Sequence, residues 1–519
     1  MKEFNITGTC IPRKHYMVDI TQKLEQIIDL IEHEKYFTIN RARQYGKTTT
    51  LASLYSRLKE KYLILRLSFE GMGDETFVTG QAFVKAFIKK IGKFMQRIKA
   101  NENMVTTWEN TSNLTDDTDS LEYLSDKITE LCENCDKEIL LFIDEVDKSA
   151  DNQIFLHFLG MLRNKYLSRE EGLDSTFKSV ILAGVYDIKN LKIKIRPNAE
   201  KKYNSPWNIA VDFNIDMSFS PAEIATMLES YEADYHTGMD IQKISEELYF
   251  YTNGYPYLVS RLCKWIDEEG NRKWTSDSII QAEKELQKSD STLLDDLSKN
   301  YENNKALQNM INGILYEGKQ FTFVKNDPTI NLGIRFGIFT EKENQVTISN
   351  IIFETALLNL IISKQEQAKL FSQPEKNQFI KNGKVDMKHV LLKFQELMKA
   401  EYRTEDEKFI EQQGRLLFLC FLKPIINGTG FYFVEPETRS NTRMDIVVVY
   451  GNEEHIIELK IWHGKQYRKD GIEQLKQYMD SRNTKKGYLL SFSFLKDKQY
   501  TSGTIEEIGT TKKIFEVVV

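Results

Sequence analysis

The stretch YFTINRARQYGKTTTLASL, residues 36–54, joins an apolar strand-like run to a helix-like run through a glycine turn. A phosphate-binding loop has the pattern G-x-x-x-x-G-K-[ST], in which backbone amides and the lysine hold phosphates and the hydroxyl reaches a magnesium ion. Gly46, Lys47 and Thr48 fit the end of this pattern, but Arg41 stands at its first glycine position. Because Gly-Lys-Thr also occurs by chance, other parts of the chain must distinguish a nucleotide site from an ordinary turn.

The composition of the chain is that of a globular protein. Its 519 residues suffice for about two to four domains with cores of their own. The hydrophobic share of 41% and the charged share of 28% are ordinary, and the net charge of −6 does not indicate a nucleic-acid binder. No apolar run approaches the roughly 20 residues of a membrane helix, and the N-terminal MKEFNITGTC lacks a hydrophobic signal core. We therefore expect a cytoplasmic protein.

The five cysteines are scattered along the chain, which is typical of reduced thiols in a cytoplasm. Cys132 and Cys135 have the spacing of half a zinc site, but no second pair of Cys or His residues accompanies them. Thiols on a helix are therefore the favoured interpretation, ahead of a metal or redox site.

Strand-like and helix-like segments alternate along the N-terminal part of the chain. Apolar runs of strand length lie near 36–40, 62–69, 138–147, 179–185 and 207–215. This alternation predicts an α/β domain with a largely parallel sheet flanked by helices. The polar segment 101–120 interrupts the pattern and is expected to be an exposed loop.

The run EILLFIDEVD, residues 138–147, ends a predicted strand in two carboxylates. Asp144 is placed to hold Mg²⁺ beside Thr48, and Glu145 to polarise the water that attacks the γ-phosphoryl group. One predicted strand lies between the lysine loop and this run and another follows it, an order typical of ATPases whose two motif strands are separated by an inserted one. The sequence therefore predicts an ATP site with Glu145 as its catalytic residue. The contacts to ATP and Mg²⁺ are expected from Arg43, Gln44, Tyr45, Gly46, Lys47, Thr48, Thr49 and Asp144.

The loop resembles that of the bacterial AAA-ATPase-like family, which typically reads R-P-R-R-F-G-K-[ST] and has no first glycine. Ala42 stands here at the usual proline position. Three later stretches are also similar to this family, namely SPWNIAVDF (205–213), FSPAEI (219–224) and TNGYPYLVSRLCKWI (252–266). The last resembles the lid of archaeal-type ATPases, where a glycine-x-proline turn introduces a helix. The resemblance implies a P-loop, AAA-like and ATP-hydrolysing core over residues 1–218 with a helical lid over 219–300.

The middle of the chain has a different pattern. In residues 301–365, helix-like segments precede a hairpin-like stretch with its turn near 341–344, and another helix-like segment follows. This order predicts a small winged-helix-like segment. The Lys- and Gln-rich residues 366–386 are the best linker candidate, and residues 387–519 return to a mixed α/β pattern.

A second group of acidic residues lies in TRMDIVVVYGNEEHIIELKIWHGK, residues 442–465. Asp445 opens an apolar strand-like run, and Glu458 and Lys460 fall on one face of the next run, because side chains alternate along a strand. Two such carboxylates bind Mg²⁺ in phosphodiesterases, where a lysine positions or deprotonates the attacking water. Glu411, on an upstream helix-like segment, is a candidate for a further metal ligand. The alternative is ordinary, since Glu-x-Lys is a common surface charge pair.

The order of these residues is similar to that of the PD-(D/E)XK nuclease superfamily. Its elements are a helix glutamate, a strand aspartate, an E-x-K strand and a helix with Q-x-x-x-Y, which Gln474 and Tyr478 match. The AAA-ATPase-like family often carries such a domain at its C-terminus. The resemblance implies Mg²⁺-dependent cleavage of nucleic acid, with DNA favoured over RNA. The implied catalytic residues are Asp445, Glu458, Lys460 and Gln474, and the implied metal ligands are Glu411, Asp445 and Glu458.

The sequence thus predicts an ATPase joined to a nuclease-like domain over residues 387–519, with ATP, Mg²⁺ and nucleic acid as ligands. Basic residues outnumber acidic ones in 460–486, which modestly supports a nucleic-acid partner. Fusions of this kind suggest a role in defence or mobile-element processing, and a homo-oligomer is left open. The alternative is an ATP-switched regulatory protein that binds nucleic acid through an inactive nuclease domain, because relatives that carry the motif can lose cleavage.

Overall fold

The computed structural model describes residues 2–519 except 111–119, 150–151, 186–206, 316–318, 368–377, 402–410, 427–429, 435–445, 452, 462–464, 483, 494–499 and 507–511. Its contacts divide the chain into two compact units. Unit 1 comprises Met1–Ala282 together with Leu332–Gly337, and unit 2 comprises Glu283–Asn331 together with Ile338–Val519. The finer boundaries expected from the sequence, at 218, 300, 365 and 386, stay predictions.

Among the described residues, a four-stranded parallel sheet forms the centre of unit 1. Its strands lie in the order β1-β4-β3-β2, and every neighbouring pair is parallel. The strands are almost continuous buried runs of Leu, Ile, Val and Phe, as is typical of strands covered on both faces. The parallel sheet predicted from the alternation is confirmed. The bounds are β1 (Phe37–Asn40), β2 (Leu63–Ser68), β3 (Ile139–Asp144) and β4 (Ser179–Gly184).

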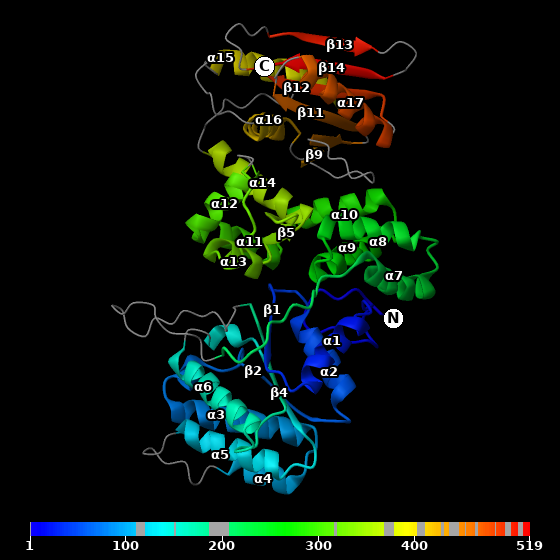
Figure 1. Cartoon of the computed structure of the whole chain (residues 1–519). Helices are drawn as coiled ribbons and strands as arrows, with labels where there is room; N and C mark the ends of the chain where they lie inside the picture. The colour runs from blue at the N-terminus through cyan, green and yellow to red at the C-terminus, as the bar shows by residue number, and fades with distance from the viewer. Residues whose placement is uncertain are drawn as a thin grey trace, which may run out of the picture. The chain divides into compact units, whose positions relative to one another are not determined.

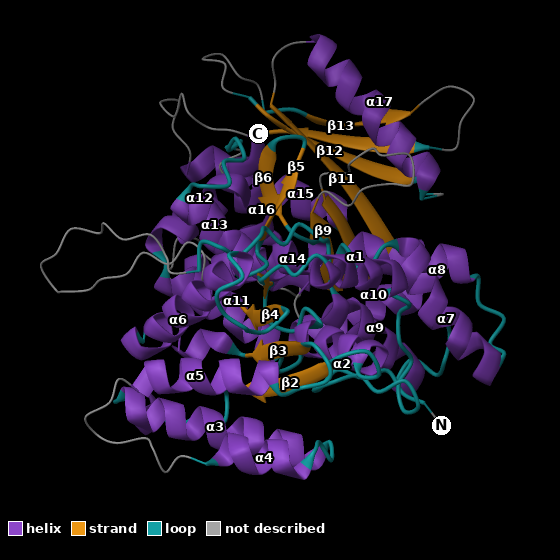
Figure 2. Ribbon diagram, turned by 60° about the horizontal axis from the view of Figure 1, so that its bottom comes forward, coloured by secondary structure: helices purple, strands orange, loops and turns teal. Residues whose placement is uncertain are grey.

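Helices cover both faces of this sheet (Figure 1, Figure 2). Ile27 and Leu54 belong to the buried cluster on one face, and Phe87 and Phe158 to the cluster on the other. The flanking helices predicted from the sequence are therefore present, and the sheet is the middle of three layers. The bounds are α1 (Thr21–Glu32), α2 (Lys47–Leu58), η1 (Asp74–Phe77), α3 (Gly80–Arg97), α4 (Glu102–Glu109), α5 (Ser120–Glu133), η2 (Val146–Ser149) and α6 (Gln153–Glu170).

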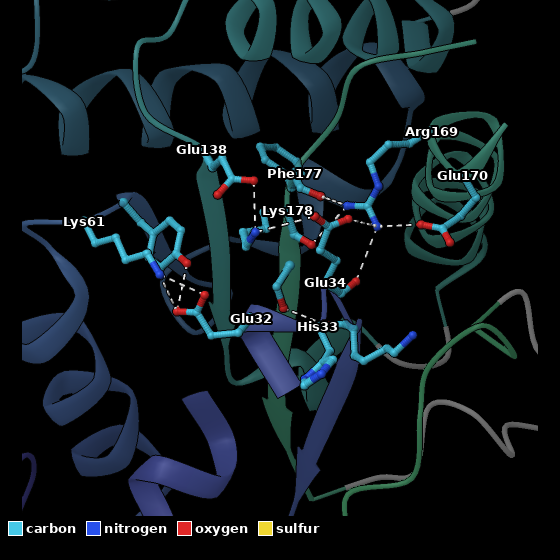
Figure 3. Close-up of polar contacts among 12 residues, drawn as sticks. Glu32, His33, Glu34, Lys61, Glu138, Arg169, Glu170, Phe177 and Lys178 are labelled. Carbon is cyan, nitrogen blue, oxygen red and sulfur yellow. Dashed lines mark hydrogen bonds and ion pairs between the residues drawn. The ribbon is translucent and has the colours of Figure 1, made fainter. Parts of the chain in front are cut away.

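A network of ion pairs closes the amino edge of the sheet (Figure 3). The Lys178 amine, directly before β4, lies 3.0 Å from a Glu138 carboxylate oxygen and 3.5 Å from one of Glu34. The Arg169 guanidinium of α6 donates to the carbonyls of Phe177 and Lys178 at 2.8 and 3.0 Å. Protein charges therefore fill the amino edge, and the carboxyl edge is the one where α/β proteins bind ligands.

The predicted strand at 207–215 is wrong. The stretch meets the sheet through one parallel bridge between Phe37 and Val211, and the Val211 amide donates to the Tyr36 carbonyl at 2.9 Å. Residues 207–209 form a turn instead of extending the pairing. The fully buried indole of Trp207 fixes this turn, because its N–H donates to the Thr38 hydroxyl at 3.1 Å.

The polar segment 101–120 is not the loop that its composition suggests. Helix α4 lies within it, and Val105 and Trp108 are buried on one side of that helix. The Trp108 indole also donates to the Ile88 carbonyl at 3.0 Å. Two apolar side chains three residues apart share a helix face, so their burial outweighs the polar composition around them. Residues 111–119 of this segment lie outside the described residues.

The helices of the predicted lid follow in the chain. Helix α7 begins with a capping box, in which Ser220 and Glu223 each accept from the backbone amide of the other. Helix α9 begins at Pro256, directly after a turn in which Gly254 has φ of 70°. The lid helices α7 to α9 and the sheet belong to the same compact unit. The bounds are α7 (Pro221–Tyr235), α8 (Ile241–Thr252), α9 (Pro256–Glu268) and α10 (Ser276–Lys288).

Unit 2 begins with helices and a hairpin. The predicted hairpin is present as β5 and β6, with Glu343 and Asn344 at positive φ in its turn. A bridge from Thr322 to Gln345 adds one more segment to it. One described helix, α13, stands between that segment and β5, and the winged-helix assignment stays a prediction. The bounds are α11 (Thr292–Asn303), α12 (Lys305–Leu315), α13 (Pro328–Arg335), β5 (Phe339–Lys342), β6 (Gln345–Ile348) and α14 (Ile351–Gln367).

Part of the predicted linker 366–386 is ordered as secondary structure. Helix α14 reaches Gln367, and a short antiparallel hairpin is formed by β7 (Ile380–Lys381) and β8 (Lys384–Val385). Residues 368–377 lie outside the described part of the chain. Every helix that the structure describes is too short or too polar to cross a lipid bilayer.

The C-terminal part of unit 2 contains a sheet of six described strands in the order β13-β14-β12-β11-β10-β9. β10 pairs antiparallel with both β9 and β11, β12 pairs parallel with both β11 and β14, and β13 runs antiparallel to β14. The mixed α/β pattern predicted after residue 387 is therefore present. The bounds are α15 (Met387–Glu401), α16 (Glu411–Ile426), β9 (Gly430–Val434), β10 (Ile446–Tyr450), β11 (Glu453–Ile461), α17 (Lys465–Ser481), β12 (Lys486–Phe492), β13 (Ser502–Glu506) and β14 (Lys513–Val518).

Helices lie on both faces of this second sheet. Gly471 of α17 is so close to the sheet that an added Cβ would lie 3.5 Å from Leu489 of β12. On the opposite face, Phe492 of β12 packs against α15 and α16. The ring centroid of Phe394 in α15 lies 6.3 Å from that of Phe492, and Gly414 of α16 contacts the Phe492 ring. Helix α17 therefore covers the sheet face on which Leu489 lies.

Candidate functional site

The predicted phosphate-binding loop joins β1 to α2 at the carboxyl edge of the first sheet. Gly46 is the N-cap residue of α2 with φ of 77°, and Gln44 has φ of 56°. Left-handed backbone at a residue other than glycine costs about 1–2 kcal/mol and persists only where surrounding contacts impose it. The path turns the chain into α2, whose N-terminal amides carry partial positive charge suited to an anion.

Arg41 stands where most phosphate-binding loops have glycine, and it anchors the start of the loop. Its guanidinium donates to the carbonyls of Asn40 and Ile215 at 3.0 and 2.6 Å. It also lies 5.3 Å from the ring centroid of Phe213, and burial lowers the pKa of Arg41. The side chain therefore fastens the loop to the stretch that follows Val211.

Lys47 lies within the curve of the loop. Its amine donates to the carbonyls of Arg41 and Ala42 at 2.9 and 2.8 Å. Burial lowers the pKa of Lys47 to about 8, although the negative charges of Asp147 and Asp144 oppose this shift. A buried amine at the start of α2 is suited to the phosphate groups of a ligand, because their negative charge favours its protonated form.

Thr48 and Asp144 meet as the sequence predicts. The Thr48 hydroxyl donates to Asp144 Oδ2 at 2.8 Å, and the Glu145 amide donates to Asp144 Oδ1 at 3.0 Å. Asp144 ends β3 opposite Ser68 of β2, so both side chains lie at the carboxyl edge of the sheet. Hydroxyl and carboxylate oxygens are ligands that Mg²⁺ prefers, and these residues fit the predicted ion.

Glu145 follows Asp144 in a strained conformation. Its φ of 55° is uncommon for a residue that carries a side chain, and such strain concentrates at functional sites. A cavity of about 340 Å³ is lined by Thr48, Asp144 and Glu145, and Arg66 of β2 is also part of its lining. Sequence reasoning missed Arg66, because its alternation within β2 marks it only as polar in an apolar strand.

Asp147 is a second residue that sequence reasoning missed. Both of its carboxylate oxygens accept from the amide of Val185, at 2.7 and 2.8 Å, directly after β4. A Cβ on Gly184 would lie 2.7 Å from Asp147 Oδ1, so glycine allows this approach. Of the negative charges that counteract the lowering of the Lys47 pKa, the charge of Asp147 has the largest effect. Its position three residues after Asp144 was the available signal.

The other predicted loop residues act through backbone or packing. The Tyr45 ring packs edge-on against Tyr255 of the lid at 4.7 Å between centroids, and burial raises the pKa of Tyr45 to about 12. The side chains of Arg43 and Gln44 are exposed. The Thr49 hydroxyl accepts from a backbone amide of the N-terminal segment at 3.1 Å. Tyr255, whose hydroxyl donates to the Arg43 carbonyl at 2.5 Å, was also missed.

Glu458 and Lys460 of the second predicted site lie together on β11. The Lys460 amine is 2.9 Å from Glu458 Oε1, and the Glu458 side chain is 1% exposed. A Cβ on Gly471 of α17 would lie 3.0 Å from Lys460 Cγ, so the pair lies beneath that helix. Within α17, the Gln474 amide donates to the Tyr478 hydroxyl at 2.8 Å.

The remaining members of the second site cannot be placed. Asp445 lies outside the described residues, and Glu411 begins α16 but its side chain is not described. Across the residues that the structure does describe, no group of three or more His, Cys, Asp or Glu side chains is arranged to hold a metal ion. Cys132 is not part of such a group of described residues either. Burial raises the pKa of its thiol to about 12 and so disfavours the thiolate that metal binding requires.

Some of the basic residues near the second site are paired with acids. Arg468 forms a two-pronged contact with the Glu516 carboxylate, with distances of 2.6 to 3.0 Å. Arg482 lies 3.6 Å from Glu454. These pairs reduce the positive charge that the sequence count suggests for this surface.

Comparisons with known proteins add the following. Residues 382–496 match a family described as a domain of unknown function, DUF8371, and no curated protein matches the sequence. A Walker-type ATPase of Pyrococcus abyssi is 13% identical, with 68% of this chain and 99% of that chain covered and a TM-score of 0.44. The ORC2 protein of Aeropyrum pernix, in ADPNP–ADP complexes, is 13% identical, with coverages of 70% and 98% and a TM-score of 0.37. The ORC1 protein of the same organism, in complex with DNA, is 9% identical, with coverages of 67% and 94% and a TM-score of 0.31.

Similarity at this level does not transfer a ligand or an activity. By the geometry of its own residues, unit 1 has the fold of a P-loop ATPase. A parallel sheet is flanked by helices, and the lysine loop and the strand-end aspartate meet at its carboxyl edge.

Proposed function

We propose that unit 1 binds ATP together with Mg²⁺ and hydrolyses it. The observation that carries the proposal is the 2.8 Å contact between the Thr48 hydroxyl and Asp144, which are 96 residues apart in the chain. This contact lies beside the amine of Lys47, which two loop carbonyls hold in place. A magnesium ligand pair and a phosphate-binding lysine at one sheet edge are the parts that phosphoryl transfer requires.

Each residue has a role in this proposal. The amides of residues 42–47 and the Lys47 amine hold the phosphates, and Arg43, Gln44, Tyr45, Gly46 and Thr49 contribute the backbone around them. Thr48 and Asp144 hold Mg²⁺, which when bound stabilises charge on the phosphoryl oxygens. Glu145 orients the attacking water and accepts its proton. The strained backbone of Glu145, and its place in the lining of the cavity that Thr48 and Asp144 also line, support this role.

Calorimetry with ATP and a phosphate-release assay test the proposal. Lys47→Ala is expected to abolish ATP binding, whereas Lys61→Ala, which removes an exposed partner of Glu32, leaves it unchanged. Glu145→Gln is expected to keep ATP affinity and to lower kcat by about 10²- to 10⁴-fold. Phosphate release by Lys47→Ala at the wild-type rate would overturn the proposal.

We propose a second function for the C-terminal sheet, Mg²⁺-dependent cleavage of nucleic acid, with DNA favoured. The pairing of β10 with β11 supports it, because Ile446 lies opposite Ile457. In the sequence Asp445 directly precedes Ile446, and Glu458 directly follows Ile457. The Glu458–Lys460 pair beneath the helix that carries Gln474 also supports it.

Nicking of supercoiled plasmid in Mg²⁺, with and without ATP, tests this second function. Asp445→Ala, Glu458→Gln and Lys460→Ala are expected to abolish nicking. The control is Glu453→Gln on the same strand, whose carboxylate pairs with Lys384 and which should nick normally. If the wild-type chain binds DNA or RNA but cleaves neither, the nuclease proposal fails and the ATP-switched regulatory alternative stands.

A further inference from the structure

The phosphate-binding loop needs support from outside itself. Of the residues from Arg41 to Gly46, only the last is glycine, so five residues with side chains must follow the tight path. Gln44 takes a left-handed conformation within it, which is unfavourable for the isolated chain. The loop is therefore retained in this shape by contacts with other segments of unit 1.

Tyr255 of the lid supplies one of these contacts. Its hydroxyl donates to the Arg43 carbonyl at 2.5 Å, and its ring packs edge-on against Tyr45 at 4.7 Å. The two preceding carbonyls, of Arg41 and Ala42, accept from the Lys47 amine. Three consecutive carbonyls of the loop, at residues 41–43, therefore accept from donors of the protein, two from Lys47 and one from the lid.

Tyr255 is itself held in a rigid turn. It is 2% exposed, it is the N-cap residue of α9, and its amide donates to the Thr252 carbonyl at 3.0 Å. The preceding Gly254 packs against the backbone of Phe219, whose amide donates to the Gly254 carbonyl at 2.8 Å. The turn that links the lid helices therefore fixes the position of the Tyr255 hydroxyl.

A third segment of unit 1 packs against both the phosphate-binding loop and Tyr255. Gly337 has φ of 72°, and an added Cβ would lie 2.8 Å from the Ala42 side chain and 3.3 Å from the Tyr255 ring. This segment, Leu332–Gly337, belongs to unit 1 although its neighbours in the chain belong to unit 2. The loop and Tyr255 are thus packed together from a third direction.

We infer that Tyr255 is a positioning residue for the phosphate-binding loop, and that the affinity for nucleotide depends on this lid hydroxyl. The inference rests on the proposed ATP site. A loop that is held in its binding conformation binds without first being ordered, and a loop that holds this conformation only part of the time binds more weakly in proportion. The hydroxyl thus helps, from outside the loop, to hold a tight backbone path that a glycine at the first position makes sterically easier in other loops.

The test compares Tyr255→Phe with Tyr249→Phe in the full chain. Tyr255→Phe keeps the ring and removes the hydrogen bond, so the KM for ATP should rise about 3- to 10-fold. The kcat should stay within about twofold, because the loop holds the phosphates in both ground and transition state. Amide hydrogen exchange in residues 42–47 of the nucleotide-free chain should become faster. Tyr249 lies on α8 of the same lid, and its hydroxyl makes no hydrogen bond with the described residues, so Tyr249→Phe should change none of these quantities.

The outcomes separate the inference from the proposal beneath it. A purely structural role for Tyr255 would lower the midpoint of thermal unfolding and leave KM and loop exchange unchanged, which overturns the inference. If the wild-type chain hydrolyses ATP and Tyr255→Phe has the same KM for ATP, the inference about Tyr255 is overturned. The proposed ATP site then still stands. If the wild-type chain has no affinity for ATP, the proposed function and the inference both fall.

Discussion

Buried charge controls the candidate ATP site at the level of single residues. Burial lowers the pKa of Lys47 to about 8, and the carboxylates of Asp147 and Asp144 counteract only part of that shift. The phosphates of a nucleotide would add negative charge next to this amine and favour its protonated form. Affinity for ATP and protonation of Lys47 are therefore linked.

This linkage predicts that ATP binding takes up protons. At pH 8 about half of the Lys47 amine is uncharged before binding, and near pH 6 almost none is. Uptake should therefore be small near pH 6 and increase toward pH 9. Calorimetric titration in two buffers of different ionisation enthalpy measures it. Lys47→Arg should bind without uptake, because arginine stays charged throughout this range; equal uptake at pH 6 and pH 9 would contradict the prediction.

Glu283 is a buried acid outside the ATP site. Burial raises its pKa from 4.5 to about 7, and its described hydrogen-bond partner is Gln287, which also donates to the Ile352 carbonyl. Between about pH 4.5 and 7 the folded state keeps a proton that the unfolded state has lost. The stabilising contribution is therefore complete below pH 4.5, and it is lost as the pH rises through 7.

Glu283→Gln should remove this pH dependence. In the wild-type chain, the contribution of Glu283 to the free energy of unfolding should fall by about 3 kcal/mol as the pH rises from 4.5 to above 7. This follows because each unit of pKa shift corresponds to about 1.36 kcal/mol. Chemical denaturation at pH 4.5 and at pH 8 measures it. The wild-type chain should lose more stability than the variant between these pH values, and equal losses would show that the carboxyl group is not buried in this way.

At the scale of secondary-structure elements, the two edges of the first sheet carry different groups of residues. The amino edge is closed by the network of Arg169 and Lys178 with glutamates, which joins α6 to the start of β4 (Figure 3). The carboxyl edge carries the lysine loop, Asp144 and Asp147. The strand direction separates the two, because side chains that follow parallel strands all meet at one edge.

Arg169→Ala should destabilise unit 1 by about 2–4 kcal/mol, because it removes two hydrogen bonds to backbone carbonyls and takes the guanidinium away from the rings of Tyr36 and Tyr166. Thermal or urea unfolding of the wild-type protein and of Arg169→Ala measures the difference in stability. A suitable control is Arg272→Ala, since Arg272 is 49% exposed and pairs with Asp267. Because water and salt screen a pair at the surface, its loss should destabilise the protein less than the loss of Arg169 does. Equal effects of the two substitutions would show that the edge network is not stabilising.

At the scale of the whole molecule, the chain divides into two compact units, and the residues described for the candidate ATP site belong to unit 1. Leu332–Gly337 joins that unit although the sequence places it within a later segment. A ligand that binds only the folded form of unit 1 stabilises that unit and has no direct effect on the core of unit 2.

Thermal unfolding should therefore show two transitions, of which nucleotide shifts one. At a concentration of 100 times the Kd, binding adds about 2.7 kcal/mol to the stability of the unit that binds. Differential scanning calorimetry with a non-hydrolysable ATP analogue and Mg²⁺ measures the shift. Lys47→Ala should show two transitions that the analogue does not move. A single transition that moves as a whole would mean that the two units unfold together.

Local patterns were enough to predict much of the fold. The alternation of apolar runs predicted the parallel sheet, because strands covered on both faces must be apolar along their whole length. The glycine turn before α2 and the carboxylate after β3 predicted the meeting of Thr48 and Asp144, because strand ends at one edge bring these positions together. The same reasoning failed at Trp207 and at Trp108, where one large buried ring imposed a local structure that composition did not indicate.

Contacts between distant segments were needed for the rest of the site. Tyr255 reaches Arg43 from 212 residues further along the chain, and Asp147 receives the Val185 amide from 38 residues away. Gly337 packs against Ala42 only because Leu332–Gly337 joins unit 1. Periodicity and motif spacing report on neighbours within one element or one turn, whereas these contacts depend on how whole elements pack, which the spacing of residues along the chain does not encode.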